Sequence, residues 1–193
     1  MYKLIPLDRH CIVEVNDFPL PEINVDMLDF TETKHVSNSE NAKRLFYDYT
    51  DKKFNRLFED LVLTKVLPLM ETHPLYNKST LSTVSNDDMT VVGTIFKDQV
   101  GWSQQLHTDM PRLLLTGVVH ITECVEGTTF YDAPDSALKF YEPTPGLEPV
   151  YVAPTKPKTG AFWLNIPTSF HQVNKITVER NHFLFLLTTK DKQ

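Results

Sequence analysis

The sequence predicts a mainly β protein, a sandwich or barrel with supporting helices. From Asp88 onward, short segments rich in β-branched and aromatic residues alternate with Gly, Pro and Asn-Asp breaks, a texture typical of all-β sandwiches and barrels. Between residues 38 and 70 the apolar residues recur at helical spacing instead. The chain has 193 residues, 41% of them hydrophobic, which is enough for one core. We therefore expect a single domain, with residues 1–87 as N-terminal strands and supporting helices and residues 88–190 as the β core.

Prolines punctuate the first 36 residues, which carry only short apolar pieces. Pro6, Pro19 and Pro21 interrupt the segment, and the apolar run 11–15 lies between the first two. Because proline has no N–H to donate to a sheet, it is confined to strand edges and strand starts. We expect one or two edge strands and an extended lead-in here.

A capping signal and an apolar stripe predict one or two helices over about residues 38–70. Ser37 stands at an N-cap position and Glu40 three residues later, which is the pattern of a capping box. Pro68 should end or kink the helix near residues 66–67. The apolar stripe must cover the sheet, and it follows the i, i+3, i+4, i+7, i+8 spacing: Phe54, Leu57, Phe58, Leu61 and Val62.

The expected strands of the β core are short and separated by turn residues. Neither an internal repeat nor a second domain boundary is visible among them. They lie at residues 90–96, 113–122, 127–131, 149–153, 160–164 and 183–189.

Charge and cysteine content narrow the setting and the partners. The net charge of −6 argues against a nucleic-acid partner, because phosphate binding depends on Lys and Arg. Cys11 and Cys124 are too few for a disulfide framework, and Cys124 fits a small core residue. No apolar run approaches the roughly 20 residues of a membrane span, and residues 1–8 lack the apolar region of a signal peptide. We expect a soluble protein in the reducing cytoplasm, and the oligomeric state is left open.

His107, Asp109 and His171 predict a metal site. Residues i and i+2 of a strand point to the same face about 7 Å apart, so His107 and Asp109 can both reach one ion. His171 follows 62 residues after Asp109. Two imidazoles and one carboxylate form the facial triad of non-haem Fe(II) sites, with coordination positions left open. An H-x-D pair by itself fits two polar residues at a strand end equally well.

Arg180 adds an anion-binding group to this set. It stands nine residues after His171, just before the apolar run 183–187. A planar, always-charged guanidinium in that position suits bidentate capture of a carboxylate.

The ordered set H-x-D, G-T-x-F, H and R resembles the Fe(II)/2-oxoglutarate-dependent dioxygenases, and more narrowly their prolyl-hydroxylase-like and small phage or bacterial members. The matching segment runs from about Gly101 to Leu187 and includes Gly127–Tyr131. The resemblance implies a double-stranded β-helix, which is a cupin-like jelly roll. It also implies that His107, Asp109 and His171 bind Fe(II) and that Arg180 binds the distal carboxylate of 2-oxoglutarate. The implied reaction consumes O₂, releases succinate and CO₂, and hydroxylates the substrate.

Three further residues are candidates at this site. Many family members carry Ser or Thr two residues after the arginine, where this chain has His182; we expect His182 to be either a substitute donor or a wall residue. Trp102 could shape the substrate entrance. Arg112 could bind an acidic substrate group at the pocket mouth or form a salt bridge at the rim. His120 fits a satisfied barrel histidine, and the remaining histidines are expected to be exposed: His10, His35 and His73.

Two other functions fit the same motifs. A cupin-like metal enzyme that does not use 2-oxoglutarate usually shows an H-x-H pair, which is missing here. A non-catalytic jelly-roll binding protein could retain a vestigial site. Within the family, repair enzymes that act on alkylated bases carry a second arginine in an R-x-N-x-T-x-R strand, and the run after Arg180 lacks it. We expect a small-molecule or peptidyl substrate, with a slight preference for a peptidyl one.

Overall fold

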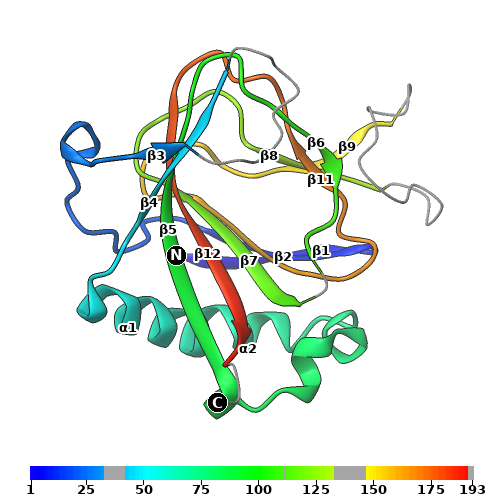
Figure 1. Ribbon diagram of the computed structural model, residues 1–193. Helices are drawn as coiled ribbons and strands as arrows, with labels where there is room; N and C mark the ends of the chain where they lie inside the picture. The colour runs from blue at the N-terminus through cyan, green and yellow to red at the C-terminus, as the bar shows by residue number, and fades with distance from the viewer. Residues whose placement is uncertain (33–41, 111, 133–146, 191–193) are drawn as a thin grey trace.

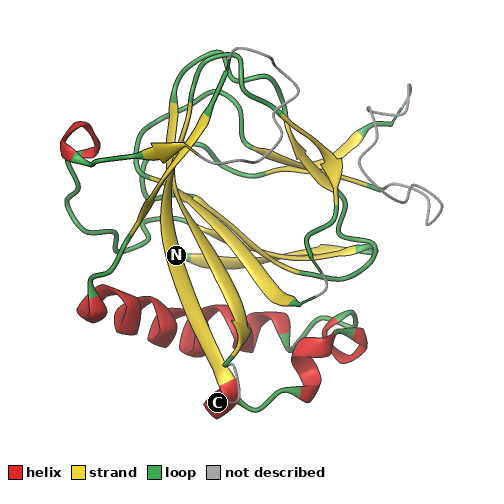
Figure 2. Ribbon diagram, viewed as in Figure 1, coloured by secondary structure: helices red, strands yellow, loops and turns green. Residues whose placement is uncertain are grey.

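The computed structural model describes residues 1–32, 42–110, 112–132 and 147–190, which form two antiparallel sheets and a helical layer (Figure 1). The mainly β prediction is confirmed. Figure 2 shows the main helices gathered along one side of the large sheet, away from the small one. No helix in these described segments is long and apolar enough to cross a membrane.

The large sheet has eight strands and the small sheet has four. The large one runs, in spatial order, through β1 (Tyr2–Leu7), β2 (His10–Val15), β10 (Gly160–Leu164), β7 (Leu113–His120), β12 (Arg180–Thr189), β5 (Met89–Asp98), β4 (Arg44–Asp48) and β3 (Thr31–Glu32). The small one runs through β6 (Gln104–His107), β11 (His171–Val173), β8 (Thr128–Tyr131) and β9 (Pro149–Val152). The first four strands, β1 to β4, therefore all belong to the large sheet.

The main core lies between the large sheet and the helices. Successive side chains of a strand point to opposite faces, so Phe183, Phe185 and Leu187 of β12 face the helical layer and belong to this core. Phe58 meets them there, fully buried and with its ring 4.7 Å from that of Phe185. The opposite face of β12, which includes Leu184, faces the inside of the barrel.

The helical layer begins later than the sequence suggests. Helix α1 spans Lys52–Leu61, and the Asp51 carboxylate caps it by accepting from two backbone N–H groups. The predicted start near residue 38 is wrong, because residues 44–48 pair with β5 as strand β4. The capping box at residues 37–40 lies outside the described residues. Leu57 is exposed at 38%, whereas the rest of the predicted stripe packs inward.

Pro68 neither ends nor breaks the helical run. A π-helical turn (Val62–Val66) follows α1, and α2 (Leu67–Met70) continues from it with Pro68 in its first turn. Proline is tolerated there because the N–H groups of a first turn have no helical partner. Short 3₁₀ turns complete the described helices: Val25–Met27, Tyr76–Lys78, Thr80–Thr83 and Asn86–Asp88.

The other strand predictions were largely right, with two differences. All six expected core strands are present, within a few residues at each end. Strand β1 is an edge of the large sheet, as predicted for one of the first strands, whereas β2 is not an edge because it pairs with β1 on one side and with β10 on the other. The short strand β11 was not predicted, and the strand assumed at residues 107–109 ends at His107, so that Asp109 lies beyond β6.

Candidate metal centre

The three predicted ligands come together at one point of the small sheet. His171 on β11 is the register partner of His107 on β6, and Asp109 follows β6 by two residues. One Asp109 oxygen lies 3.8 Å from Nε2 of His107, and the other lies 3.8 Å from Nε2 of His171. The ligand atoms all lie within 4.8 Å of one another, and no other such group of three occurs in the described residues. This arrangement can hold one metal ion.

Backbone carbonyls orient both histidine rings. Nδ1 of His107 donates to the Gln105 carbonyl at 2.8 Å, and Nδ1 of His171 donates to the Ser169 carbonyl at 2.9 Å. With Nδ1 of each ring directed at a carbonyl, Nε2 of each ring faces the Asp109 carboxylate. Such hydrogen bonds around a metal site set the tautomer and the ring orientation.

Trp163 holds the carboxylate. Its indole Nε1 donates to Oδ2 of Asp109 at 3.1 Å, and its ring packs 4.9 Å from the ring of His171. The sequence suggested no such role for Trp163, which lies in the middle of the apolar strand β10.

The electrostatics keep His107 in the form that binds metals. Burial, followed by the neighbouring His171, lowers the pKa of His107 to about 4. The ring is therefore neutral at pH 7, as a metal ligand must be. The side-chain amide of Gln104 lies 3.0 Å from Nε2 of His107 and donates to it; a bound ion would take over that lone pair.

A cavity of about 600 Å³ extends from the metal centre between the two sheets. Its mouth carries Gln105, Thr108 and Met110, the last exposed at 52%. Its wall on the large sheet is mostly apolar and includes Leu113, Thr116, Val118, Leu184 and Leu186.

Arg180 forms a charged end of this cavity. It lines the cavity although its side chain is only 1% exposed. Its Nε and Nη2 donate to Oδ2 of Asp98 at 2.9 and 2.8 Å, and its Nη1 has no partner in the part of the chain that the structure describes. Asp98 lies at the end of β5 and is fully buried.

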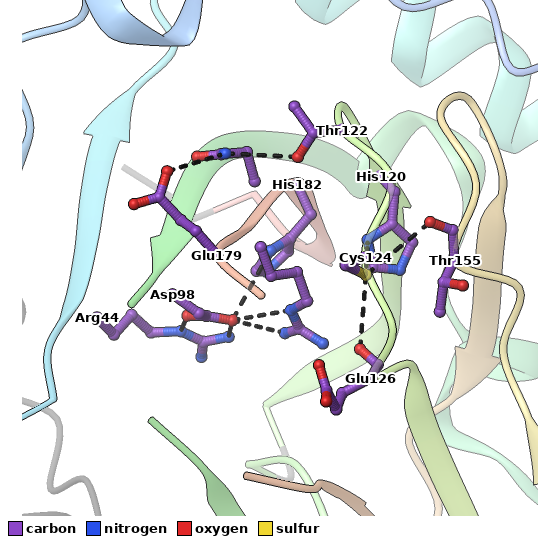
Figure 3. Close-up of polar contacts among 11 residues, drawn as sticks. Arg44, Asp98, His120, Thr122, Cys124, Glu126, Thr155, Glu179 and His182 are labelled. Atoms are coloured by element: carbon purple, nitrogen blue, oxygen red, sulfur yellow. Dashed lines mark hydrogen bonds and ion pairs between the residues drawn. The ribbon is translucent and has the colours of Figure 1, made fainter. Parts of the chain in front are cut away.

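A second guanidinium, that of Arg44, shares the same carboxylate. Its Nε donates to Oδ1 of Asp98 at 2.6 Å and its Nη2 donates to Oδ2 at 3.3 Å. In Figure 3 the dashed contacts of this group converge on Asp98. Arg44 lines the cavity too. No local sequence pattern points to Arg44, because only the pairing of β4 with β5 brings it here.

The remaining candidates lie at different depths. Trp102 lines the cavity, and its buried Nε1 has no acceptor. His182 is fully buried beside Asp98, with neither ring nitrogen hydrogen-bonded, and is not among the residues that line the cavity. Burial and then Arg180 lower its pKa well below the usual value, so it is neutral. Arg112 is exposed and lies outside the cavity lining.

The other histidines differ from expectation because tertiary packing covers them. His10 and His73 are buried and not exposed; His10 contacts the Tyr131 carbonyl through Nε2 at 3.1 Å. His120 is buried, as predicted for a barrel histidine, but only its Nδ1 has a partner, the thiol of Cys124 at 3.4 Å. His35 lies outside the described residues.

Comparison with known proteins places the fold. No protein-family model and no curated protein matches the chain. The epimerase SnoN, in complex with Fe³⁺, alpha ketoglutarate and nogalamycin RO, is 10% identical and aligns over 86% of this chain and 70% of its own, with a TM-score of 0.53. HygX from Streptomyces hygroscopicus, with nickel and 2-oxoglutarate bound, is 14% identical over 86% of this chain and 76% of its own, with a TM-score of 0.51.

A prolyl-4-hydroxylase from Pseudomonas putida aligns over 80% of this chain and 78% of its own, at 12% identity and a TM-score of 0.48. Sequence identities at this level support a shared fold and nothing beyond it. The fold shared with SnoN and HygX, together with the two antiparallel sheets, confirms the predicted jelly roll.

Proposed function

We propose that this protein is an Fe(II)- and 2-oxoglutarate-dependent oxygenase that hydroxylates a small molecule or a peptidyl side chain. The observation that carries the proposal is a single cavity with two complementary features. It has a His-Asp-His triad and, lining the same cavity, a buried arginine with an unpaired N–H group. The resemblance in motif order and the fold shared with two proteins that bind 2-oxoglutarate agree with it.

The donor set fits Fe(II). Two neutral imidazole nitrogens and one carboxylate are the ligands of non-haem Fe(II) sites and leave positions free for other ligands. Each protein ligand is held from behind, His107 and His171 by backbone carbonyls and Asp109 by the Trp163 indole. The site is therefore preorganised for a metal ion.

The charged end of the cavity fits the distal carboxylate of 2-oxoglutarate. Arg44 and Arg180 carry two positive charges against the single negative charge of Asp98, so this end has a net charge of +1 (2 − 1). A buried charge without a partner is costly, and Nη1 of Arg180 and Nε1 of Trp102 lack acceptors among the described residues. A carboxylate would offset the net charge and could accept from both N–H groups.

The chain's own residues divide the work of the reaction. When bound, Fe(II) and 2-oxoglutarate supply, with O₂, the oxidising power for hydroxylation as the 2-oxo acid becomes succinate and CO₂. His107, Asp109 and His171 would hold the metal, and Arg180 would orient the cosubstrate. Asp109 keeps a carboxylate where the related halogenases have a small residue, which favours hydroxylation.

The substrate would enter through the uncharged mouth and meet an apolar wall. The volume of about 600 Å³ lies within the range of small-molecule sites, and it leaves room for a side chain or a compact metabolite beside the cosubstrate. The net charge of −6 favours these substrates over a nucleic acid.

Binding and turnover with metal-loaded protein test the proposal. Protein loaded anaerobically with Fe(II) should bind 2-oxoglutarate and, with O₂ and a panel of peptides and metabolites, release succinate. Asp109→Ala should abolish metal binding, and Arg180→Ala should weaken 2-oxoglutarate binding with metal binding retained. Metal binding without 2-oxoglutarate binding would favour a cupin-like metal enzyme, and absence of metal binding would favour a non-catalytic barrel.

A further inference from the structure

Three charged residues lie in one row across three neighbouring strands. Asp98 at the end of β5 is the register partner of Arg180 on β12 and also of Arg44 on β4. The carboxylate is fully buried and accepts from both guanidinium groups. Strand β4, which lies next to the edge strand β3, therefore contributes a cation to the interior of the jelly roll.

The row carries more positive charge than its surroundings offset. His120 and His182, the ionisable rings behind it, stay neutral because burial and the arginines lower their pKa values. Among the described residues that line the cavity, Asp109 at the metal centre is the only one with a formal charge apart from the two arginines. Glu126, which Figure 3 also shows, accepts a hydrogen bond from the hydroxyl of Thr177 and does not line the cavity.

Arg44, like Arg180, is fixed by several contacts. Its guanidinium carbon lies 4.1 Å from the ring centre of Trp102 and 4.7 Å from that of Phe96, while two N–H groups bind Asp98. A guanidinium has five N–H donors, so three remain on each arginine. Stacking on aromatic rings and a fixed fork are the features that suit arginine to bidentate recognition of a carboxylate.

We propose that Arg44 is a second binding residue for the distal carboxylate of 2-oxoglutarate, acting together with Arg180, and that Asp98 is the positioning residue that holds both forks. The inference rests on the proposed function and extends it. The pair takes the place of the single arginine with a Ser or Thr partner that the motif resemblance implies. His182, which stands at that partner position, lies behind the row and outside the cavity lining.

The main alternative is a structural role, in which Arg44 only fastens β4 to β5. The two roles separate with a pair of ligands. The probe 2-oxopentanoate has the same chain length and the same metal-chelating end as 2-oxoglutarate, but a methyl group replaces the distal carboxylate. A residue that contacts this carboxylate affects only 2-oxoglutarate, whereas a residue that shapes the cavity affects both ligands.

The experiment measures binding of both ligands to the Fe(II) protein under anaerobic conditions, by calorimetry and by the visible absorption of the metal–2-oxo acid chelate. Arg44→Met should weaken 2-oxoglutarate binding roughly 10- to 100-fold, the range for losing a hydrogen bond to a charged group. It should leave 2-oxopentanoate within about twofold. Lys43→Met is the matched control, because Lys43 is the adjacent residue and forms an exposed ion pair with Glu32; it should change neither affinity.

Three results would overturn the inference. One is an unchanged 2-oxoglutarate affinity in Arg44→Met, another is an equal loss for both ligands, and the third is an equal effect of Lys43→Met. Where Arg44→Met does not fold, as judged by thermal unfolding, Arg44→Lys replaces it. That variant keeps the charge and loses the fork, so it should still weaken 2-oxoglutarate selectively. If the unaltered Fe(II) protein does not bind 2-oxoglutarate, the proposed function itself fails.

Discussion

The hydrogen bond from Trp163 to Asp109 predicts a loss of metal affinity in Trp163→Phe. The substitution removes the Nε1–H donor, which lies 3.1 Å from Oδ2 of Asp109. It keeps a six-membered aromatic ring to pack against His171 and Phe130, whose ring centres lie 4.9 and 5.2 Å from that of Trp163. The change therefore tests the hydrogen bond more than the packing.

The size of the effect follows from the charge of the acceptor. A hydrogen bond to a charged group is worth about 1.5–3 kcal/mol, and each 1.4 kcal/mol is about a tenfold change in affinity. We expect metal binding to weaken about 10- to 100-fold, which is also the usual effect of removing a residue that orients a metal ligand. The carboxylate is partly buried, with 16% of its side chain exposed, so water replaces the lost donor only in part.

Anaerobic equilibrium dialysis against Fe(II) or Co(II) measures this affinity without relying on tryptophan fluorescence. Trp102→Phe is the matched control, because the indole N–H of Trp102 has no acceptor and its loss should leave metal affinity within about twofold. The reasoning is refuted if Trp163→Phe binds the metal as tightly as the unaltered protein, or if Trp102→Phe loses as much affinity.

Three further predictions concern stability. Gly160→Ala should destabilise the fold by about 3 kcal/mol, because the new Cβ would lie 1.8 Å from the Val118 carbonyl oxygen. Gly93→Ala, whose new Cβ would have its nearest neighbour at 3.4 Å, should cost far less. Equal urea midpoints for the two variants would contradict this difference. Phe58→Ala should cost about 3–5 kcal/mol, since this fully buried ring joins α1 to the sheet; a loss below about 1 kcal/mol in urea unfolding would show that the helix packs without it. Acid should destabilise the metal-free protein. Burial and then Arg180 lower the pKa of His120 to about 3. From about pH 6.5 downward, the unfolded chain therefore takes up a proton at this ring that the native chain does not. His120 alone should make the protein about 2 kcal/mol less stable at pH 5 than at pH 7, and a flat profile between these pH values in urea unfolding would exclude the mechanism.

Local patterns in the sequence predicted most of the fold and the metal triad. The alternation of short β-branched runs with turn residues predicted the six core strands, because strand formation there depends on local propensity and breaks. The residue types and order of His107, Asp109 and His171 predicted the triad, although Asp109 lies two residues beyond the end of β6 and not on the strand that the i, i+2 spacing assumed. The helix start was wrong, because residues 44–48 owe their strand conformation to pairing with β5.

Other features depend on contacts between segments far apart in the chain. The burial of His10 and His73 and the hydrogen bond from Trp163 to Asp109 leave no trace in the local pattern. Arg44 is the clearest case, because it lies 54 residues from Asp98 and outside the segment that resembles a known family.

The sequence by itself therefore predicted the residue types of the candidate metal triad and determined the fold class. Residue types and short spacings carry that information, because ligand identity and strand periodicity are local properties. Only the tertiary structure decided that two arginines share one carboxylate at the charged end of the cavity. Strand register alone sets Arg44, Asp98 and Arg180 side by side, and register is a property of the whole sheet, fixed by which faces are buried.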